Sequence, residues 1–173
     1  GGAGYSRIID PAIADYIVSN RSELLSALAS AVSGEIIYVN DTAEINLTFD
    51  RDIIIPANVT LASGRGRDGS SGALVYSNNI SNISEVFQLF KTGGEGVRIT
   101  GIRLQGPDGE IGEGAYNFSN SRGVYSTHDV EVDNSELSNW SHCAVCLYYS
   151  PASVTPQIHH NFIHHNRRSG LGY

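Results

Sequence analysis

The sequence predicts an all-β solenoid of short parallel strands with a short α-helix at its N-terminal end. A pattern of apolar, Ser or Asn positions suited to a solenoid interior occurs three times, starting at Ile99, Val132 and Ile158. Its offsets of 33 and 26 residues are about one coil plus variable loops. Many short β-forming segments are separated by Gly, Ser, Asn and Asp clusters, which indicates strands joined by turns.

The predicted helix spans residues 22–33. Asn20 and Glu23 can cap its first turn, an apolar stripe follows, and Gly34 ends it. We expect this helix to cover the first open coil, because an exposed row of unpaired backbone groups invites aggregation. The strands expected along the chain are 35–39, 43–47, 52–55, 59–61, 73–76, 86–90, 97–104, 130–137, 144–148 and 157–163.

Composition bounds the domain organisation and the partners. With 173 residues, 40% of them hydrophobic and 17% charged, the chain fits one domain with a substantial core. We assign residues 1–19 to an N-terminal extension and residues 20–173 to the solenoid domain, which can be the first part of a longer solenoid. The net charge of -7 argues against nucleic acid as the partner, and no apolar run approaches the roughly 20 residues that span a bilayer.

Eight N-x-[ST] sequons indicate a glycosylated protein at the cell surface or outside the cell. The alternative is that Asn and Ser serve turns in a loop-rich chain. The start Gly1-Gly2-Ala3-Gly4, without Met, is consistent with a removed secretion signal. The candidate glycosylation sites are Asn20, Asn40, Asn46, Asn58, Asn79, Asn82, Asn117 and Asn139.

The runs 22–34, 35–39, 53–61, 64–66 and 97–104 together resemble right-handed parallel β-helix proteins of the pectate-lyase-like superfamily. The resemblance covers most of residues 20–173 and implies the right-handed parallel β-helix as the form of the all-β solenoid. Pectate lyases of this fold bind calcium through carboxylates and use an Arg to remove a proton next to a uronate carboxylate. The family's Trp-Ile-Asp-His segment and its Arg-x-Pro-x-x-Arg context are missing here, and a fold likeness does not carry a function.

Two clusters are the candidates for lyase-like chemistry. Oxygen ligands suited to calcium follow the rung at Leu104, although Gly-Pro-Asp-Gly-Glu is also an ordinary turn sequence. Clustered His and Arg after the rung at Ile163 can transfer protons or bind an acidic sugar, and the alternative is a solvated turn. The calcium candidates are Asp108, Glu110 and Glu113, and the catalytic candidates are His164, His165, Arg167 and Arg168.

The cysteines allow three states. Cys143, Cys146, His159 and His164 have the spacing of a two-Cys, two-His zinc site, but no basic recognition helix accompanies them. A disulfide between Cys143 and Cys146 suits an extracellular protein, and two buried free thiols are the third possibility.

Aromatic residues gather in the second half of the chain, where sugar rings can stack on them. We therefore single out Trp140, Tyr148 and Tyr149 as candidate carbohydrate-binding residues. The alternative is that these rings cover loops and ladder ends.

The favoured interpretation is a secreted or cell-surface glycosylated module with a structural, adhesive or glycan-binding role. Its partners would be a polysaccharide or glycan surface, and further copies stacked on an end that lacks a polar cap. The alternatives are a polysaccharide lyase or hydrolase acting on an acidic glycan, and a zinc-stabilised module. The sequence assigns no cofactor with certainty and leaves calcium as a candidate.

Overall fold

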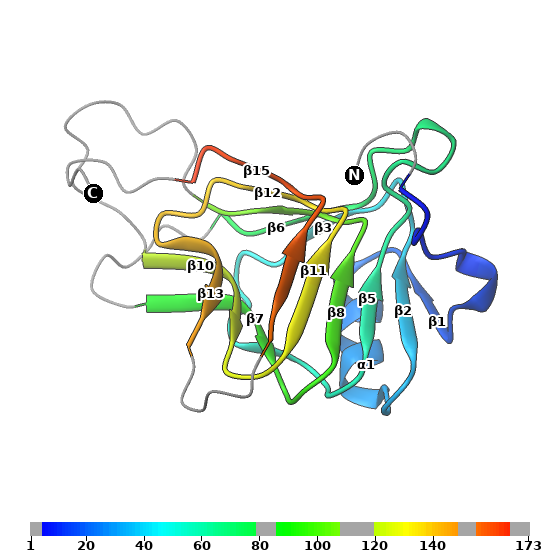
Figure 1. Ribbon diagram of the computed structural model, residues 1–173, viewed down its shortest axis with the longest axis horizontal. Helices are drawn as coiled ribbons and strands as arrows, with labels where there is room; N and C mark the ends of the chain where they lie inside the picture. Colours follow the sequence, from blue (N-terminus) through cyan, green and yellow to red (C-terminus); the bar gives the residue numbers. More distant parts are fainter. Residues whose placement is uncertain (1–4, 79–85, 108–119, 149–154, 167–173) are drawn as a thin grey trace.

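The computed structural model describes residues 5–78, 86–107, 120–148 and 155–166. These residues form fifteen strands in three sheets, one α-helix and two 3₁₀ helices, and every strand pair is parallel (Figure 1). Sheet A has the order β1 (Tyr16–Val18), β2 (Ile36–Val39), β5 (Thr60–Ala62), β8 (Val97–Thr100), β11 (Val130–Asp133) and β14 (Gln157–His159).

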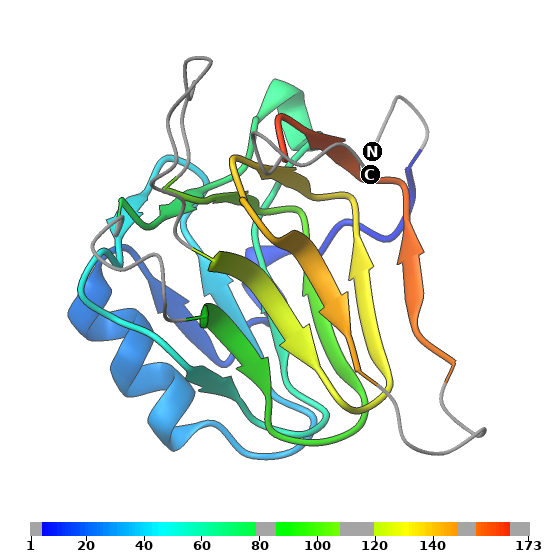
Figure 2. The same cartoon turned by 90° about the vertical axis from the view of Figure 1, so that its left-hand side faces the viewer.

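The other two sheets are built from the strands between those of sheet A. Figure 2 looks toward sheet C, where green β7, yellow-green β10 and orange β13 lie side by side. Sheet B has the order β15 (Phe162–His164), β12 (Glu136–Ser138), β9 (Arg103–Gln105), β6 (Leu74–Tyr76) and β3 (Glu44–Asn46). Sheet C has the order β13 (Cys143–Leu147), β10 (Asn120–Ser126), β7 (Val86–Thr92) and β4 (Ile53–Ile55).

The threefold sequence pattern corresponds to strand register. Val132 on β11 is the partner of both Ile99 on β8 and Ile158 on β14. In sheet B, Leu137 is likewise the partner of Leu104 and Ile163. The recurring positions of the sequence therefore lie directly beside one another, as parallel pairing requires.

The structure corrects the predicted fold class. The prediction was an all-β right-handed parallel β-helix solenoid with a capping helix, whereas the described residues form a mixed, α/β-like arrangement of three parallel sheets and one α-helix. The physical reason lies in the helix, which shares one hydrophobic core with the strands instead of covering that core as an accessory. The sequence therefore predicted the helix correctly but assigned it the wrong role, that of a cap outside the core.

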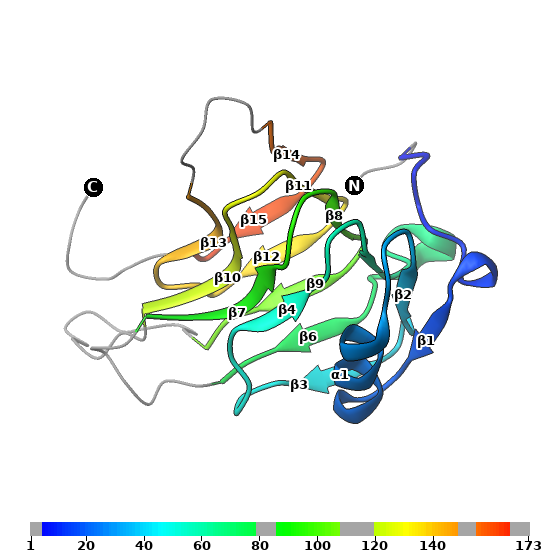
Figure 3. The ribbon, with the colours of Figure 1, turned by 90° about the horizontal axis from the view of Figure 1, so that it is seen from below.

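Helix α1 (Arg21–Ser30) is positioned by its first turn and by one apolar face. The Asn20 side chain accepts a hydrogen bond from the Glu23 backbone N–H at 3.0 Å, and Glu23 reaches back to the Ser19 N–H at 2.7 Å. Leu24 and Leu28 are buried against the strands, and Figure 3 shows α1 beside β1 and β2 at one end of the molecule. The helix ends three residues before its predicted end, because the backbone is already extended at the residue after Ser30.

Three corners between sheets A and B have left-handed backbone. Gly101, Asn134 and His160 follow β8, β11 and β14, and all three have positive φ, at 67°, 50° and 55°. At Gly101 a Cβ atom would also collide with the carbonyl oxygen of Ser63, so this corner requires glycine. The remaining turns include the 3₁₀ helices η1 (Pro11–Ile13) and η2 (Arg67–Gly69).

One hydrophobic core runs through the molecule from Val18 to Ala144. It fades toward the last two strands, where Ile158, Phe162 and Ile163 are at least one third exposed. None of the helices in the described part of the chain is long and apolar enough to cross a bilayer.

Candidate functional site

The outer face of sheet A carries a row of polar side chains. Thr60, Arg98, Glu131 and Gln157 are partners in register on β5, β8, β11 and β14. They project outward because side chains alternate along a strand and the neighbouring positions in β8 and β11 are buried in the core. The fold thus aligns four different hydrogen-bonding groups across adjacent strands.

Asp133, the next outward position of β11, is fully buried. Arg98 donates from Nε and Nη2 to its two carboxylate oxygens at 2.9 Å each, and Thr100 donates at 3.0 Å. The hydroxyl of Tyr5 also donates to this carboxylate. Burial raises the pKa of Asp133 to about 7, and the charge of the nearby His159 acts in the opposite direction. Hydrogen bonds to a carboxylate also favour its ionised form.

Glu131 lies between three cationic or proton-carrying groups. Arg7 donates to both carboxylate oxygens, with Nη2 3.0 Å from Oε2. His159 Nε2 is 3.0 Å from Oε1, and Arg98 Nε is 3.6 Å from Oε2. The hydrogen bond from Arg7 lowers the pKa of Glu131 against the opposing effect of burial, with smaller contributions from His159 and Arg98. Glu131 is therefore an ionised acceptor at neutral pH.

A cavity of about 200 Å³ lies beside this row, at the start of β8, β11 and β14. It is smaller than the roughly 300–1,000 Å³ of pockets that enclose drug-sized ligands. It can therefore hold one small unit of a larger ligand rather than a whole one. Its polar lining includes Arg98, Asp129, Glu131, Thr155 and Gln157.

The His pair predicted to be catalytic lies on sheet B, away from this row. His164 Nε2 is 3.4 Å from Glu136 Oε1, and its Nδ1 is 2.6 Å from Nδ1 of His165. Glu136 also accepts a hydrogen bond from Arg65 at 2.8 Å. Arg167 and Arg168, the other two members of the predicted cluster, lie outside the described residues.

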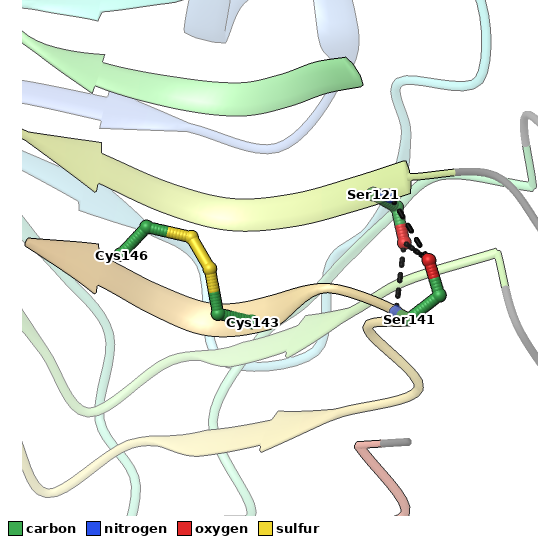
Figure 4. The surroundings of a disulfide bond; sticks show 4 residues. All are labelled: Ser121, Ser141, Cys143 and Cys146. Atoms are coloured by element: carbon green, nitrogen blue, oxygen red, sulfur yellow. Dashed lines mark hydrogen bonds between the residues drawn. A yellow bond between two sulfur atoms is a disulfide. The ribbon is translucent and has the colours of Figure 1, made fainter. Parts of the chain in front are cut away.

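Cys143 and Cys146 are joined by a disulfide on β13, with 5.7 Å between their Cα atoms (Figure 4). Both sulfurs are therefore unavailable to the predicted zinc site, whose two histidines lie on different sheets, His159 on β14 and His164 on β15. Among the described residues, the one group of potential metal ligands is these cysteines with His142, and its two sulfurs are already bonded.

The end of sheet C near the disulfide is fixed by two buried serines. Ser121 and Ser141 each donate a backbone N–H to the other's hydroxyl at 3.0 Å, as Figure 4 shows. Their hydroxyl oxygens are 3.2 Å apart. This reciprocal pair ties the start of β10 to the chain entering β13.

The predicted carbohydrate-binding aromatics have separate environments. Trp140 is fully buried and its indole N–H donates to the Leu104 carbonyl at 3.3 Å, so it offers no face to a sugar. Tyr148 is 70% exposed and stacks with Tyr125 on sheet C. Tyr149 lies outside the described residues, as do the calcium candidates Asp108, Glu110 and Glu113.

Most sequons that the structure describes are on the surface. Asn20, Asn40, Asn46 and Asn58 are exposed, and Asn139 is partly exposed. The remaining candidates, Asn79, Asn82 and Asn117, lie outside the described residues.

Sequence reasoning missed the residues that the structure brings together on sheet A. A signal was present, because Arg98 and Glu131 carry opposite charges at equivalent positions of two copies of the repeat. Tyr5 and Arg7 had no such signal, since they contact β11 across more than 120 residues of chain. No protein-family model, curated protein or solved structure matches this chain.

Proposed function

We propose that this protein is a glycan-binding module whose binding site is the outer face of sheet A. The observation that carries the proposal is the in-register row of Arg98, Glu131 and Gln157 along the small polar cavity. Small-molecule sites use a few convergent polar groups to fix the ligand's orientation. Planar side chains with paired donors or acceptors suit the neighbouring hydroxyls of a sugar ring.

The charge at the cavity favours a neutral glycan over an acidic one. Its lining has one cation, Arg98, and two carboxylates, Asp129 and Glu131, which gives a formal charge of 1 - 2 = -1. The whole chain has a net charge of -7, so an acidic polymer would be repelled on approach.

The proposed location is outside the cell or on its surface. The disulfide between Cys143 and Cys146 supports it, because disulfides persist in oxidising compartments. Exposed sequons such as Asn40 and Asn46 are compatible with glycosylation during secretion.

The proposal can be tested by affinity electrophoresis of the folded protein. The gels contain a neutral polymer (xylan, mannan or β-glucan) or the acidic polymer polygalacturonate. We expect retardation by at least one neutral polymer. Gln157→Ala should weaken binding about two- to tenfold, the equivalent of losing one hydrogen bond of about 0.5–1.5 kcal/mol. Gln105→Ala, the same change on sheet B, is the matched control. No retardation, retardation by polygalacturonate alone, or equal effects of the two variants would contradict the proposal.

Glycan hydrolysis is the second candidate. The observation that favours it is the pair of carboxyls on β11, since Glu131 has a lowered pKa and Asp133 a raised one. Binding remains the first choice because both carboxylate oxygens of Asp133 already accept hydrogen bonds from Arg98, and one also accepts from Thr100, which leaves Asp133 poorly placed to act as a catalytic acid or base. Release of reducing ends from a bound neutral polymer, lost in Glu131→Gln, would establish hydrolysis, and intact polymer after prolonged incubation would exclude it.

A further inference from the structure

The chain segment Tyr5–Ser6–Arg7, which we term the strap, lies on the candidate glycan site. Tyr5 donates its hydroxyl to Asp133, and Arg7 donates to both carboxylate oxygens of Glu131. Arg98 in turn donates from Nη2 to the carbonyl oxygen of Arg7 at 3.1 Å. In Figure 1 the first described residues, in dark blue, lie near the arrowhead ends of sheet A.

The strap and the cavity use the same side chains. Arg98 and Glu131 line the cavity, and both also bind the strap. A ligand that engages their outward-facing atoms must therefore share these groups with Arg7 or displace it.

The strap also explains why Asp133 is excluded from solvent. Asp133 belongs to the outer face of β11, and yet it is completely excluded from solvent. Arg98 and Thr100 hold its carboxylate from the sheet, and the phenol of Tyr5 contributes a hydroxyl donor from the strap. A sugar hydroxyl is a donor of the same kind, so Tyr5 occupies a position that a glycan can use.

The contacts that hold the strap are few and partly exposed to solvent. The side chain of Arg7 is 50% exposed, and exposed ion pairs contribute little to stability. No hydrogen bond joins the backbone of residues 5–9 to the backbone of another described residue. Besides the polar contacts, the ring of Tyr5 lies 5.2 Å from that of His160. Segments with this contact pattern open at low free-energy cost.

We propose that the strap is an intramolecular competitor for the glycan site, which a glycan displaces by replacing Tyr5 on Asp133 and Arg7 on Glu131. This inference rests on the proposed function. It adds that the free protein is self-blocked, so its apparent affinity for a glycan is lower than the intrinsic affinity of the open site.

The test compares the wild-type protein with the double variant Tyr5→Phe, Arg7→Ala. Arg51→Ala is the control, because Arg51 is also a partly exposed arginine paired with a carboxylate, that of Asp52. The first readout needs no ligand. Carboxyl labelling with a carbodiimide and glycine ethyl ester, followed by mass spectrometry, should show Asp133 reacting several-fold faster in the double variant only. Glu44, exposed on sheet B, serves as the internal reference.

The second readout is affinity for the neutral polymer that retards the wild type most. We expect the double variant to bind roughly three- to tenfold more tightly, because removing the competitor raises the fraction of open protein. Unchanged labelling of Asp133 would overturn the strap as a cover. Faster labelling with unchanged or weaker binding would overturn the competition and make the strap part of the site. If neither wild type nor variant binds any polymer, both the proposed glycan binding and the competition by the strap are refuted. If both bind with equal affinity, only the competition by the strap is refuted.

Discussion

The buried ion pair of Arg98 and Asp133 is the residue-scale feature on which the candidate site depends. Asp133 is fully buried, and Arg98 retains only 14% of its side-chain exposure. A charge in such a place is tolerated because both carboxylate oxygens receive guanidinium hydrogen bonds. Removing one partner leaves the other charge buried and unpaired.

We expect Arg98→Met to lower the free energy of unfolding by about 3–5 kcal/mol, the usual cost of breaking a buried pair from one side. Arg21→Met is the matched control. Arg21 also makes two hydrogen bonds to one carboxylate, that of Asp50, but its side chain is 53% exposed, so its loss should cost less than about 1 kcal/mol. Urea denaturation of both variants provides the measurement, and equal losses would show that burial of the Arg98 pair has no energetic consequence.

The lowered pKa of Glu131 predicts a pH dependence. A carboxyl whose pKa is lower in the folded state than its unfolded value of about 4.3 stabilises the fold above that value. The contribution disappears as the pH falls through the lowered pKa, where Glu131 takes up a proton and releases Arg7. Between about pH 6 and pH 3, wild type should therefore lose more unfolding free energy than Glu131→Gln. Urea titrations at the two pH values measure the difference, and parallel losses would refute it.

At the scale of elements, strands β14 and β15 and the turns that follow them repeat one five-residue unit. His159-His160-Asn161 and His164-His165-Asn166 form equivalent networks at two corners. In each, the Asn amide donates to a carbonyl of the neighbouring strand region, Val132 at 2.7 Å and Leu137 at 2.9 Å. The same amides accept the backbone N–H groups of Ser135 and Trp140, both at 2.9 Å.

Asn161→Ala and Asn166→Ala should each lower the free energy of unfolding by about 1–3 kcal/mol, because each leaves the N–H of a buried residue without its acceptor. Asn78→Ala, an exposed asparagine, should change stability by less than about 0.5 kcal/mol. Chemical denaturation compares the three variants. If Asn78→Ala lowers the free energy of unfolding as much as the two corner variants do, the hydrogen bonds of Asn161 and Asn166 make no particular contribution to stability.

Strand positions were more predictable than the site. The segments at 97–104 and 130–137 were predicted as single strands, and each is a pair of strands bent at a left-handed corner, Gly101 or Asn134. The strand β10 (Asn120–Ser126) was missed because its polar sequence gives no β signal and its stability comes from β7 and β13 on either side. The contact of Tyr5 with Asp133 is not local, so no periodicity could predict it.

At the scale of the whole molecule, packing declines toward the C-terminal strands. Strands β8 and β11 are each paired on both sides and contribute fully buried residues such as Ile99 and Val132. Among the residues that the structure describes, strand β14 is at the edge of sheet A, and its Ile158 remains 36% exposed. The free energy of local opening should therefore be lower for the C-terminal strands than for β8 and β11, although all of them adjoin one core.

Hydrogen exchange followed by mass spectrometry should show this difference. Amides of β14 and β15 should exchange through local opening, well before those of β8, which should exchange only on global unfolding. Leu61→Ala, in the packed interior, should cost about 2–5 kcal/mol and accelerate exchange in β8. Equal protection of β8 and β14 would instead indicate one fully cooperative unit.

The row of polar side chains on the outer face of sheet A has a consequence for the direction in which a polysaccharide would bind. Adjacent strands are about 4.8 Å apart, and a linear polymer lying across them would meet Thr60, Arg98, Glu131 and Gln157 in that fixed order. A hydroxyl, a cation, an anion and an amide present four different contacts, so reversing the polymer would mismatch every one. Such a surface would bind a polysaccharide in one chain direction only. The reducing end would then always lie toward the same side of sheet A.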